Sequence, residues 1–129
     1  MTFVGESASG HSVVMDGPPE FGGQNLGIRP MEMLILGLGG CSSFDVILIL
    51  KKARQQVERC EVEMDYDRAE DNPKVYTRIH MHFIVSGRGL DAKRVEKAIS
   101  LSAEKYCSAS IMLGKTAQIT HDYEIVQDL

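Results

Sequence analysis

The hydrophobic residues of this chain are concentrated in one stretch, residues 31–54, which reads MEMLILGLGGCSSFDVILILKKAR. Between Leu34 and Leu50, apolar side chains occupy nearly every side of a helical projection, which is typical of a helix buried on several sides. Proline is well tolerated in the first turn of a helix, and Pro30 stands at that position. The pattern predicts a buried central helix from Pro30 to about Val57.

Glycines interrupt this apolar stretch at positions 37, 39 and 40. Each glycine inside a helix costs roughly 1 kcal/mol relative to alanine. Either the helix breaks at Gly39-Gly40 and restarts at Cys41, or another backbone packs closely against the glycines. Both interpretations predict an unusual local structure beside Cys41, which is therefore the first candidate for a functional residue.

Alternating polar and apolar positions predict strands over residues 60–67, 75–86 and 116–126, and a short hairpin over residues 3–15. A second helix is predicted from Ala92 to about Cys107, with Asp91 as its cap. This mixture of elements is typical of an α+β fold with helices on one face of a sheet. The 129 residues suit one domain, so we expect a single domain over the whole chain, 1–129.

Charge and composition narrow the possible partners. The net charge is −4 and the 14 Lys and Arg residues are scattered, whereas nucleic-acid binding needs clustered basic residues. Residues 31–50 are long enough to cross a membrane, but they contain Glu32 and Asp45, and one charge in a bilayer centre costs roughly 2.5–3.5 kcal/mol. We expect neither a nucleic-acid partner nor a membrane.

The N-terminal residues lack the basic head and apolar run of a signal peptide. Three cysteines without a secretory signal favour a reducing compartment, so we expect a cytoplasmic protein whose cysteines are catalytic or free. One helix packed on one sheet would leave part of residues 31–50 exposed to water. A large exposed apolar surface usually marks an interface, so we expect a homodimer with the central helices at its centre.

Other patterns that could carry chemistry are weak. His80 and His82 are two residues apart on a predicted strand, so they share a face and could bind a metal. No further ligand stands at a motif spacing, and the histidines are better explained as solvated residues opposite the acidic strand 60–67. The sequence has no P-loop and no dinucleotide fingerprint. We expect no cofactor and no metal.

Two motifs carry a resemblance to a known family. The segment PMEMLILGLGGCSSFDV, followed about 60 residues later by SAEKYCSASIML, resembles the OsmC/Ohr superfamily and most closely its YhfA-like branch. The resemblance implies an OsmC-like fold, in which a mixed, mostly antiparallel sheet wraps around the buried central helix of an intertwined homodimer. It also implies active sites at the subunit interface. The characterised branches are thiol peroxidases that act on organic hydroperoxides, with a dithiol as reductant.

The resemblance assigns roles to two cysteines. Cys41 matches the reactive cysteine, whose thiolate attacks the peroxide and becomes a sulfenic acid. Cys107 matches the second cysteine, which condenses with the sulfenic acid to form a disulfide. If the helix restarts at the glycines, a helix N-terminus would also favour the Cys41 thiolate. The alternative is that both are buried core cysteines, and Cys60, which has no counterpart in the motifs, is interpreted as structural.

The sequence departs from the peroxidase branches beside Cys41. In those branches a Glu directly follows the helix-starting Pro and pairs with an Arg from an N-terminal strand. Here Met31 follows Pro30, and the candidate acid is Glu32, nine residues before Cys41; residues 1–28 contain no Arg. Asp45 lies one turn beyond Cys41, where a carboxylate disfavours a thiolate unless it is paired, so we interpret it as structural.

Two functions remain in competition on the sequence alone. The first is a thiol-dependent peroxidase that reduces organic hydroperoxides in oxidative stress defence, with Cys41, Cys107 and Glu32 as catalytic residues. The second is a non-catalytic protein of the same fold that binds a small apolar ligand, or senses redox state, at the dimer interface. The missing Arg and the displaced Glu motivate the second function.

Overall fold

The structure, a computed structural model, describes residues 1–128. It divides into two compact units, an N-terminal unit of residues 1–36 and a C-terminal unit that begins at Gly37. Helix α1 (Pro30–Lys52) begins in the first unit and continues in the second. Each unit is described separately.

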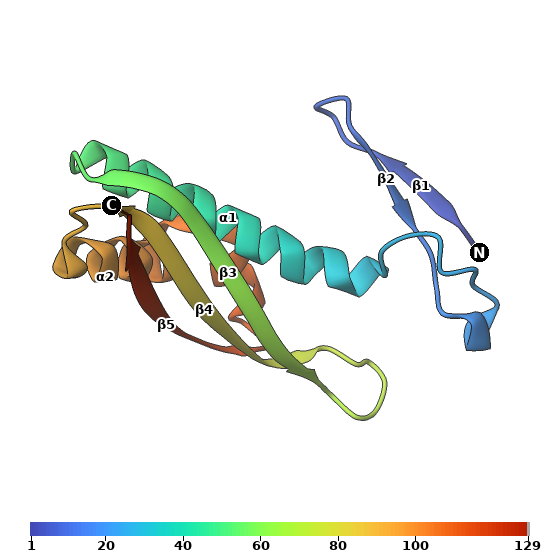
Figure 1. Ribbon diagram of the computed structural model, residues 1–129. Helices are drawn as coiled ribbons and strands as arrows, with labels where there is room; N and C mark the ends of the chain where they lie inside the picture. The colour runs from blue at the N-terminus through green and yellow to red at the C-terminus, as the bar shows by residue number, and fades with distance from the viewer. Residues whose placement is uncertain (129) are drawn as a thin grey trace. The chain divides into compact units, whose positions relative to one another are not determined.

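The N-terminal unit contains the predicted hairpin. Strands β1 (Phe3–Glu6) and β2 (Ser12–Met15) pair antiparallel (Figure 1). The loop that follows is organised by the carboxylate of Asp16, which is almost completely buried. Burial alone would raise the pKa of Asp16, but hydrogen bonds to the carboxylate lower it to about 2. The donors are the Thr2 hydroxyl (2.8 Å) and the backbone N–H groups of Gly17 (2.7 Å), Gln24 (3.2 Å) and Leu26 (3.3 Å).

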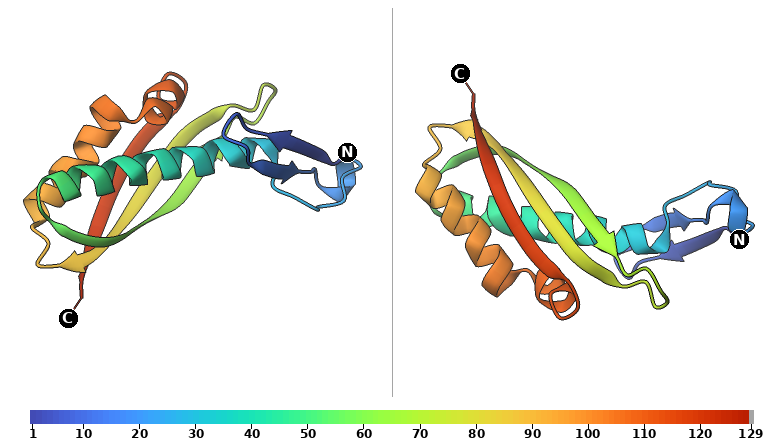
Figure 2. Two further views of the ribbon diagram at one scale, coloured as in Figure 1. Left: turned by 90° about the horizontal axis from the view of Figure 1, so that it is seen from above. Right: turned by 90° about the horizontal axis from the view of Figure 1, so that it is seen from below.

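The C-terminal unit is built on a three-stranded sheet with the order β3-β4-β5. Strand β3 (Gln56–Arg68) runs antiparallel to β4 (Tyr76–Arg88), and β5 (Gln118–Gln127) runs parallel to β4. The three predicted strands are confirmed with slightly different ends. Helices α1 and α2 (Ala92–Leu101) lie on the same face of this sheet (Figure 2), which agrees with the predicted α+β architecture.

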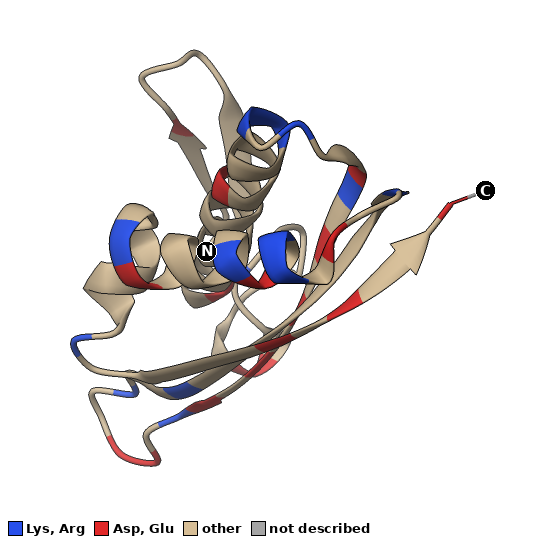
Figure 3. Ribbon diagram, turned by 90° about the vertical axis from the view of Figure 1, so that its left-hand side faces the viewer, with Lys and Arg blue, Asp and Glu red and all other residues tan. Residues whose placement is uncertain are grey.

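The outer face of the sheet is charged. Figure 3 shows acidic residues along the strands and groups of basic residues on the helices. Arg78 on β4 donates hydrogen bonds to Asp65 (3.0 Å) and Asp67 (2.7 Å) of β3. The inner face is apolar, because alternate β4 side chains from Ile79 to Val85 are buried under the helices.

Helix α1 bears out neither alternative expected at the glycines, a break or a closely packed backbone. It runs without interruption through Gly39-Gly40 and ends at Lys52, five residues earlier than expected. A Cβ atom added at Gly39 would lie 3.5 Å from the Met64 sulfur, so the close neighbour there is a side chain rather than a backbone. The helix ends where Arg54 adopts a left-handed φ of 60°, which turns the chain into β3.

One face of α1 is buried and the other is exposed. Leu38, Val46 and Leu50 are fully buried, whereas Phe44 is 70% exposed and Leu48 is 42% exposed. By length and hydropathy α1 could span a membrane, with a mean hydropathy of 2.1 over 18 residues, but core helices of soluble proteins pass the same criterion. The exposed apolar face is the kind of surface on which the homodimer prediction depends.

The predicted helix from Ala92 to about Cys107 is confirmed as a continuous helical segment, but its last five residues are π-helical. Asp91 caps α2 as expected, since its side chain accepts the Lys93 N–H at 3.0 Å, but α2 ends at Leu101. A π-helical turn, η2 (Ser102–Tyr106), follows. Cys107 then adopts an extended conformation, and α3 (Ser108–Leu113) begins directly after it. The cysteine therefore lies at a break between two helical segments.

Candidate functional site

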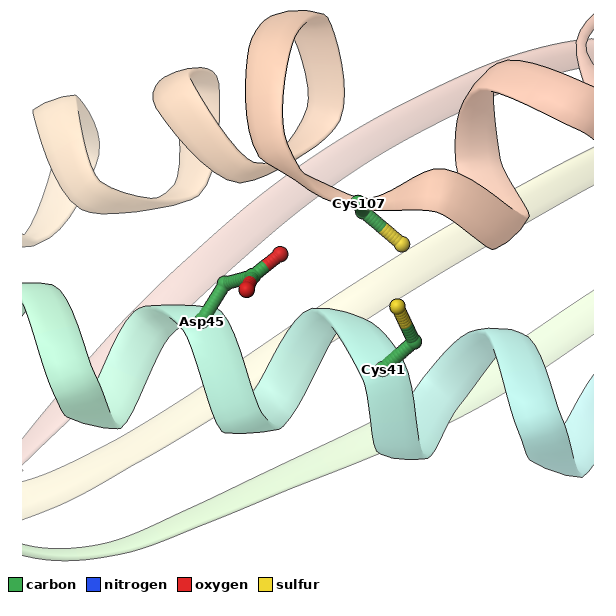
Figure 4. A group of neighbouring side chains, drawn as sticks. All are labelled: Cys41, Asp45 and Cys107. Atoms are coloured by element: carbon green, nitrogen blue, oxygen red, sulfur yellow. The ribbon is translucent and has the colours of Figure 1, made fainter.

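The structure brings Cys41 and Cys107 together. Cys41 lies in the interior of α1, and Cys107 lies between η2 and α3, with its side chain directed toward α1 (Figure 4). Asp45 lies one helical turn beyond Cys41, and its side chain lies on the same side of α1 as that of Cys41. The two sulfur atoms and a carboxylate oxygen of Asp45 all lie within 4.8 Å of one another. We call these three residues the Cys-Asp-Cys cluster.

Backbone geometry fixes the Cys107 thiol in place. Its sulfur accepts the Ser110 N–H at 3.3 Å and so caps α3. The Cys107 N–H donates to the Ser102 carbonyl at 2.8 Å. The buried Ser42 hydroxyl, on α1, donates to the same sulfur at 3.4 Å. These bonds tie α1 to the start of α3 through one sulfur atom.

The two cysteines differ in exposure. Cys107 is completely buried, whereas Cys41 is partly exposed, and neither forms a disulfide. Burial raises the pKa of the Cys107 thiol above its ordinary value, the neighbouring Cys41 raises it further, and the hydrogen bonds from Ser42 and Ser110 only partly offset this. Cys107 is therefore a protonated thiol at neutral pH, and Cys41 is the more accessible sulfur.

The position of Cys41 corrects one expectation about its chemistry. Because α1 is continuous, Cys41 lies well inside the helix and not at a helix N-terminus. The helix dipole acts only within the first turn, so it does not favour the Cys41 thiolate. The groups that donate these hydrogen bonds to Cys107 and Asp45 are two hydroxyls and a backbone N–H, and none of the three is a cation.

Asp45 has a partner within its own chain. The buried Ser102 hydroxyl, on η2, donates to Asp45 Oδ2 at 3.1 Å. Sequence reasoning gave Asp45 a structural role and missed its membership of the cluster. Its spacing of four residues from Cys41 was the available signal, because residues i and i+4 share a helix face.

Glu32 and Arg29 belong to the N-terminal unit. Glu32 is exposed in the first turn of α1, and its Oε1 accepts the Arg29 N–H at 2.8 Å, which caps the helix. The Arg29 guanidinium donates to Asn25 Oδ1 at 2.9 Å. The structure gives Glu32 this capping role, and its catalytic role stays a prediction.

The remaining candidates lie on the strands. Burial raises the pKa of Cys60, a half-buried thiol on β3 that also bonds Ser43, in keeping with a structural residue. His80 and His82 lie opposite acidic residues of β3 in the strand register, as predicted, and their side chains bond to residues of β5. The bonds are His80 to Thr120 (2.7 Å) and Asp122 (3.0 Å), and His82 to Asp122 (2.7 Å) and Glu124 (3.1 Å).

Comparison with known proteins identifies the family to which the sequence is similar. Residues 22–122 match the family described as OsmC-like protein. The chain is 50% identical over 129 residues to the protein YhfA of Escherichia coli strain K12, and the match covers 98% of this chain and 91% of that protein.

Solved structures support the fold. A hypothetical protein from Aquifex aeolicus superposes with a TM-score of 0.86 at 30% identity, over 99% of this chain and 89% of that one. The Legionella pneumophila protein described as an organic hydroperoxide resistance protein OsmC gives a TM-score of 0.68 at 13% identity, over 96% of both chains. At 13% identity, the structural similarity shows only that the two proteins share a fold.

Proposed function

This chain belongs to the OsmC-like protein family, and we propose that it is a thiol-dependent peroxidase that reduces organic hydroperoxides. The observation that carries the proposal is the approach of Cys41 and Cys107, which come from separate elements and whose sulfurs lie within 4.8 Å. Structures of this fold include organic hydroperoxide resistance proteins from Legionella pneumophila and Bacillus subtilis, which supports a peroxide-related chemistry.

The proposed reaction has two steps on the protein. The Cys41 thiolate attacks one oxygen of the hydroperoxide, the O–O bond breaks, and the alcohol leaves with a proton while Cys41 becomes a sulfenic acid. Cys107 then attacks the Cys41 sulfur, so that an S–S bond forms and the hydroxyl leaves as water with the Cys107 proton. An external dithiol reduces this disulfide and is itself oxidised to a disulfide. The sum is one hydroperoxide and one dithiol converted to an alcohol, water and one disulfide.

The exposure of the two cysteines supports this division of roles. A hydroperoxide must reach the attacking sulfur, and Cys41 is the partly exposed thiol. The resolving sulfur needs only to reach Cys41, and the completely buried Cys107 faces it (Figure 4). Glu32 remains our candidate for the acid that orients the peroxide.

The assembly and location follow the same proposal. A homodimer would cover the exposed apolar face of α1, where Phe44 and Leu48 face water in the isolated chain. A cytoplasmic location would keep both thiols reduced between turnovers.

The test is consumption of an alkyl hydroperoxide in the presence of a dithiol. Replacing Cys41 with Ser should abolish turnover, because the attacking sulfur is lost. Cys107→Ser should react once and stop, with a sulfenic acid that a dimedone probe traps. Cys60→Ser is the matched control and should keep full activity, since Cys60 lies outside the cluster on β3. A folded, reduced wild-type protein that consumes no peroxide would reject the proposal.

A second candidate function is supported by the surroundings of Cys41. Its neighbour Asp45 is an acid, and Cys41 lies inside α1 and not at the helix N-terminus, so neither feature supplies the positive potential that activates a thiolate. The candidate is a non-catalytic member of the fold that binds a small apolar ligand or senses redox state.

Alkylation by iodoacetamide distinguishes the peroxidase from the non-catalytic protein, since a peroxidase Cys41 should be alkylated at pH 6 much faster than an unfolded cysteine. A non-catalytic Cys41 should show no such excess.

A further inference from the structure

Asp45 is the feature of the cluster that peroxide chemistry does not explain. A carboxylate beside the attacking sulfur opposes formation of the thiolate, yet it lies within 4.8 Å of both sulfurs. Two thiols and one carboxylate converge on one point, and both are ligand types that divalent zinc binds. A bound cation would reverse the electrostatic conflict, because it attracts two thiolates and a carboxylate together.

The distances between the three ligand atoms are compatible with tetrahedral coordination of one ion. Zinc binds sulfur at about 2.3 Å and carboxylate oxygen at about 2.0–2.2 Å, which places ligand atoms roughly 3.5–3.8 Å apart. The three ligand atoms of the cluster already lie within 4.8 Å of one another, so rotations of side chains about χ1 and χ2 can close the remaining gap. Figure 4 shows the three side chains directed into the same space between α1 and the segment at Cys107.

Secondary hydrogen bonds support two of the three ligands. The Cys107 sulfur accepts from the Ser42 hydroxyl and the Ser110 N–H, which are the kinds of donor that offset thiolate charge. Asp45 accepts from the Ser102 hydroxyl through Oδ2, which orients the carboxylate and leaves Oδ1 for another partner. Such outer contacts fix ligand orientation before a metal arrives.

The ligands also come from rigid elements. Cys41 and Asp45 stand at positions i and i+4 of a continuous helix, the spacing that lets two helix residues bind one metal. Cys107 is fixed by its backbone bond to Ser102 and by its place at the start of α3. Little conformational freedom remains to be lost on binding.

We propose that the reduced protein binds one Zn²⁺ through Cys41 Sγ, Cys107 Sγ and the Asp45 carboxylate, with the fourth position open. Binding releases the two thiol protons, and no oxidant or reductant takes part. A disulfide between the cysteines uses the same sulfurs, so oxidation and zinc binding exclude each other. Zinc would therefore protect the reduced thiols, and oxidation by a hydroperoxide would release the metal. This regulatory consequence rests on the proposed function, whereas the zinc site itself does not.

The first experiment measures zinc directly. Reduced full-length protein competes with a chromophoric chelator for Zn²⁺, and Co²⁺ is added in parallel as a spectroscopic probe. We expect one equivalent of metal, a thiolate-to-cobalt charge-transfer band, and visible bands of tetrahedral intensity. Cys41→Ser, Cys107→Ser and Asp45→Asn should each weaken binding by at least about 100-fold, and Ser102→Ala by roughly 10–100-fold.

Controls make the result specific to this cluster. Cys60→Ser should bind zinc as the wild type does, because Cys60 lies outside the cluster. Circular dichroism verifies that each variant is folded, and Asp45→Asn keeps the shape and the Ser102 hydrogen bond. The proposal is overturned if the wild type binds no zinc, or if Asp45→Asn binds as tightly as the wild type, which would mean adventitious thiol coordination.

The two proposals fail separately. Zinc binding is measured without peroxide, so a protein that binds zinc but consumes no hydroperoxide keeps the metal site and loses the peroxidase. A protein that consumes hydroperoxide but binds no zinc keeps the peroxidase proposal and loses the metal site. If both hold, one equivalent of hydroperoxide should release the zinc from the wild type, and retention of the metal after disulfide formation would contradict the shared site.

Discussion

Oxidation of Cys41 and Cys107 to a disulfide should stabilise the protein against unfolding. The bond would join an interior residue of α1 to the start of α3 and close a loop of about 65 residues. The loss of unfolded-state entropy for a loop of that length corresponds to about 4 kcal/mol at 25 °C. Since the sulfurs must close from within 4.8 Å to about 2 Å, any strain subtracts from that figure.

The assay is urea unfolding of the reduced and oxidised protein, followed by circular dichroism. With a denaturant slope of about 2 kcal/mol per M, a gain of 4 kcal/mol moves the midpoint up by about 2 M. By the same linkage, the reduction potential of the disulfide should be about 90 mV more negative in the folded protein than in the unfolded chain. If the measured gain in the free energy of unfolding lies between about 1 and about 4 kcal/mol, its shortfall from about 4 kcal/mol is the strain energy of the disulfide.

Controls define what would refute this reasoning. Cys41→Ser should show no difference between oxidising and reducing conditions, and Cys60→Ser should show the full wild-type difference. If the oxidised wild type is equally stable or less stable than the reduced protein, the helix geometry does not accept the bond. Cys107 would then not be the resolving cysteine, even if Cys41 reacts with peroxide.

Four further predictions test other parts of the molecule. The backbone N–H of Gly17 should report an apparent pKa of about 2 for Asp16 by NMR, because the lowered pKa keeps the loop hydrogen bonds until the pH falls from about 4 through about 2; a midpoint near 3.8 would contradict this. Leu50→Ala should lower the free energy of unfolding by about 2–5 kcal/mol in urea, since Leu50 is fully buried. Leu48→Ala, at 42% exposure on the same helix, should instead weaken a homodimer in sedimentation, and an unchanged association constant would exclude that face as the interface. Glu32→Gln should lower peroxidase kcat/KM at least tenfold with the fold intact, and unchanged kinetics would limit Glu32 to helix capping.

The cysteine pair shows how far sequence reasoning reached into the site. The two motifs identified Cys41 and Cys107 through resemblance, and the structure brings their sulfurs within 4.8 Å. Asp45 was placed on the face of Cys41 by its spacing but was not assigned to the site. Its partner, the Ser102 hydroxyl, comes from 57 residues away, and no local pattern predicts a contact across that separation.

Local patterns were least reliable where tertiary contacts outweigh intrinsic preference. The glycines of α1, which each cost a helix roughly 1 kcal/mol, predicted either a break or a closely packed backbone. The helix continues because Leu38, Val46 and Leu50 bury completely on the same element, at about 1.5–3 kcal/mol for each side chain. The amphipathic pattern after Ala92 predicted the helical segment to about Cys107, but not its change to a π-helical turn at Ser102.

The sequence by itself determined the elements and their order, because helices and strands bury one face with periods of 3.6 and 2 residues. It thereby determined the long apolar helix, the three strands and the α+β class. Only the tertiary structure decided that β5 runs parallel to β4, that the histidines bond to β5, and that Cys107 leaves the helix to face Cys41 and Asp45. These features depend on contacts between residues far apart in the chain, which side-chain periodicity does not encode.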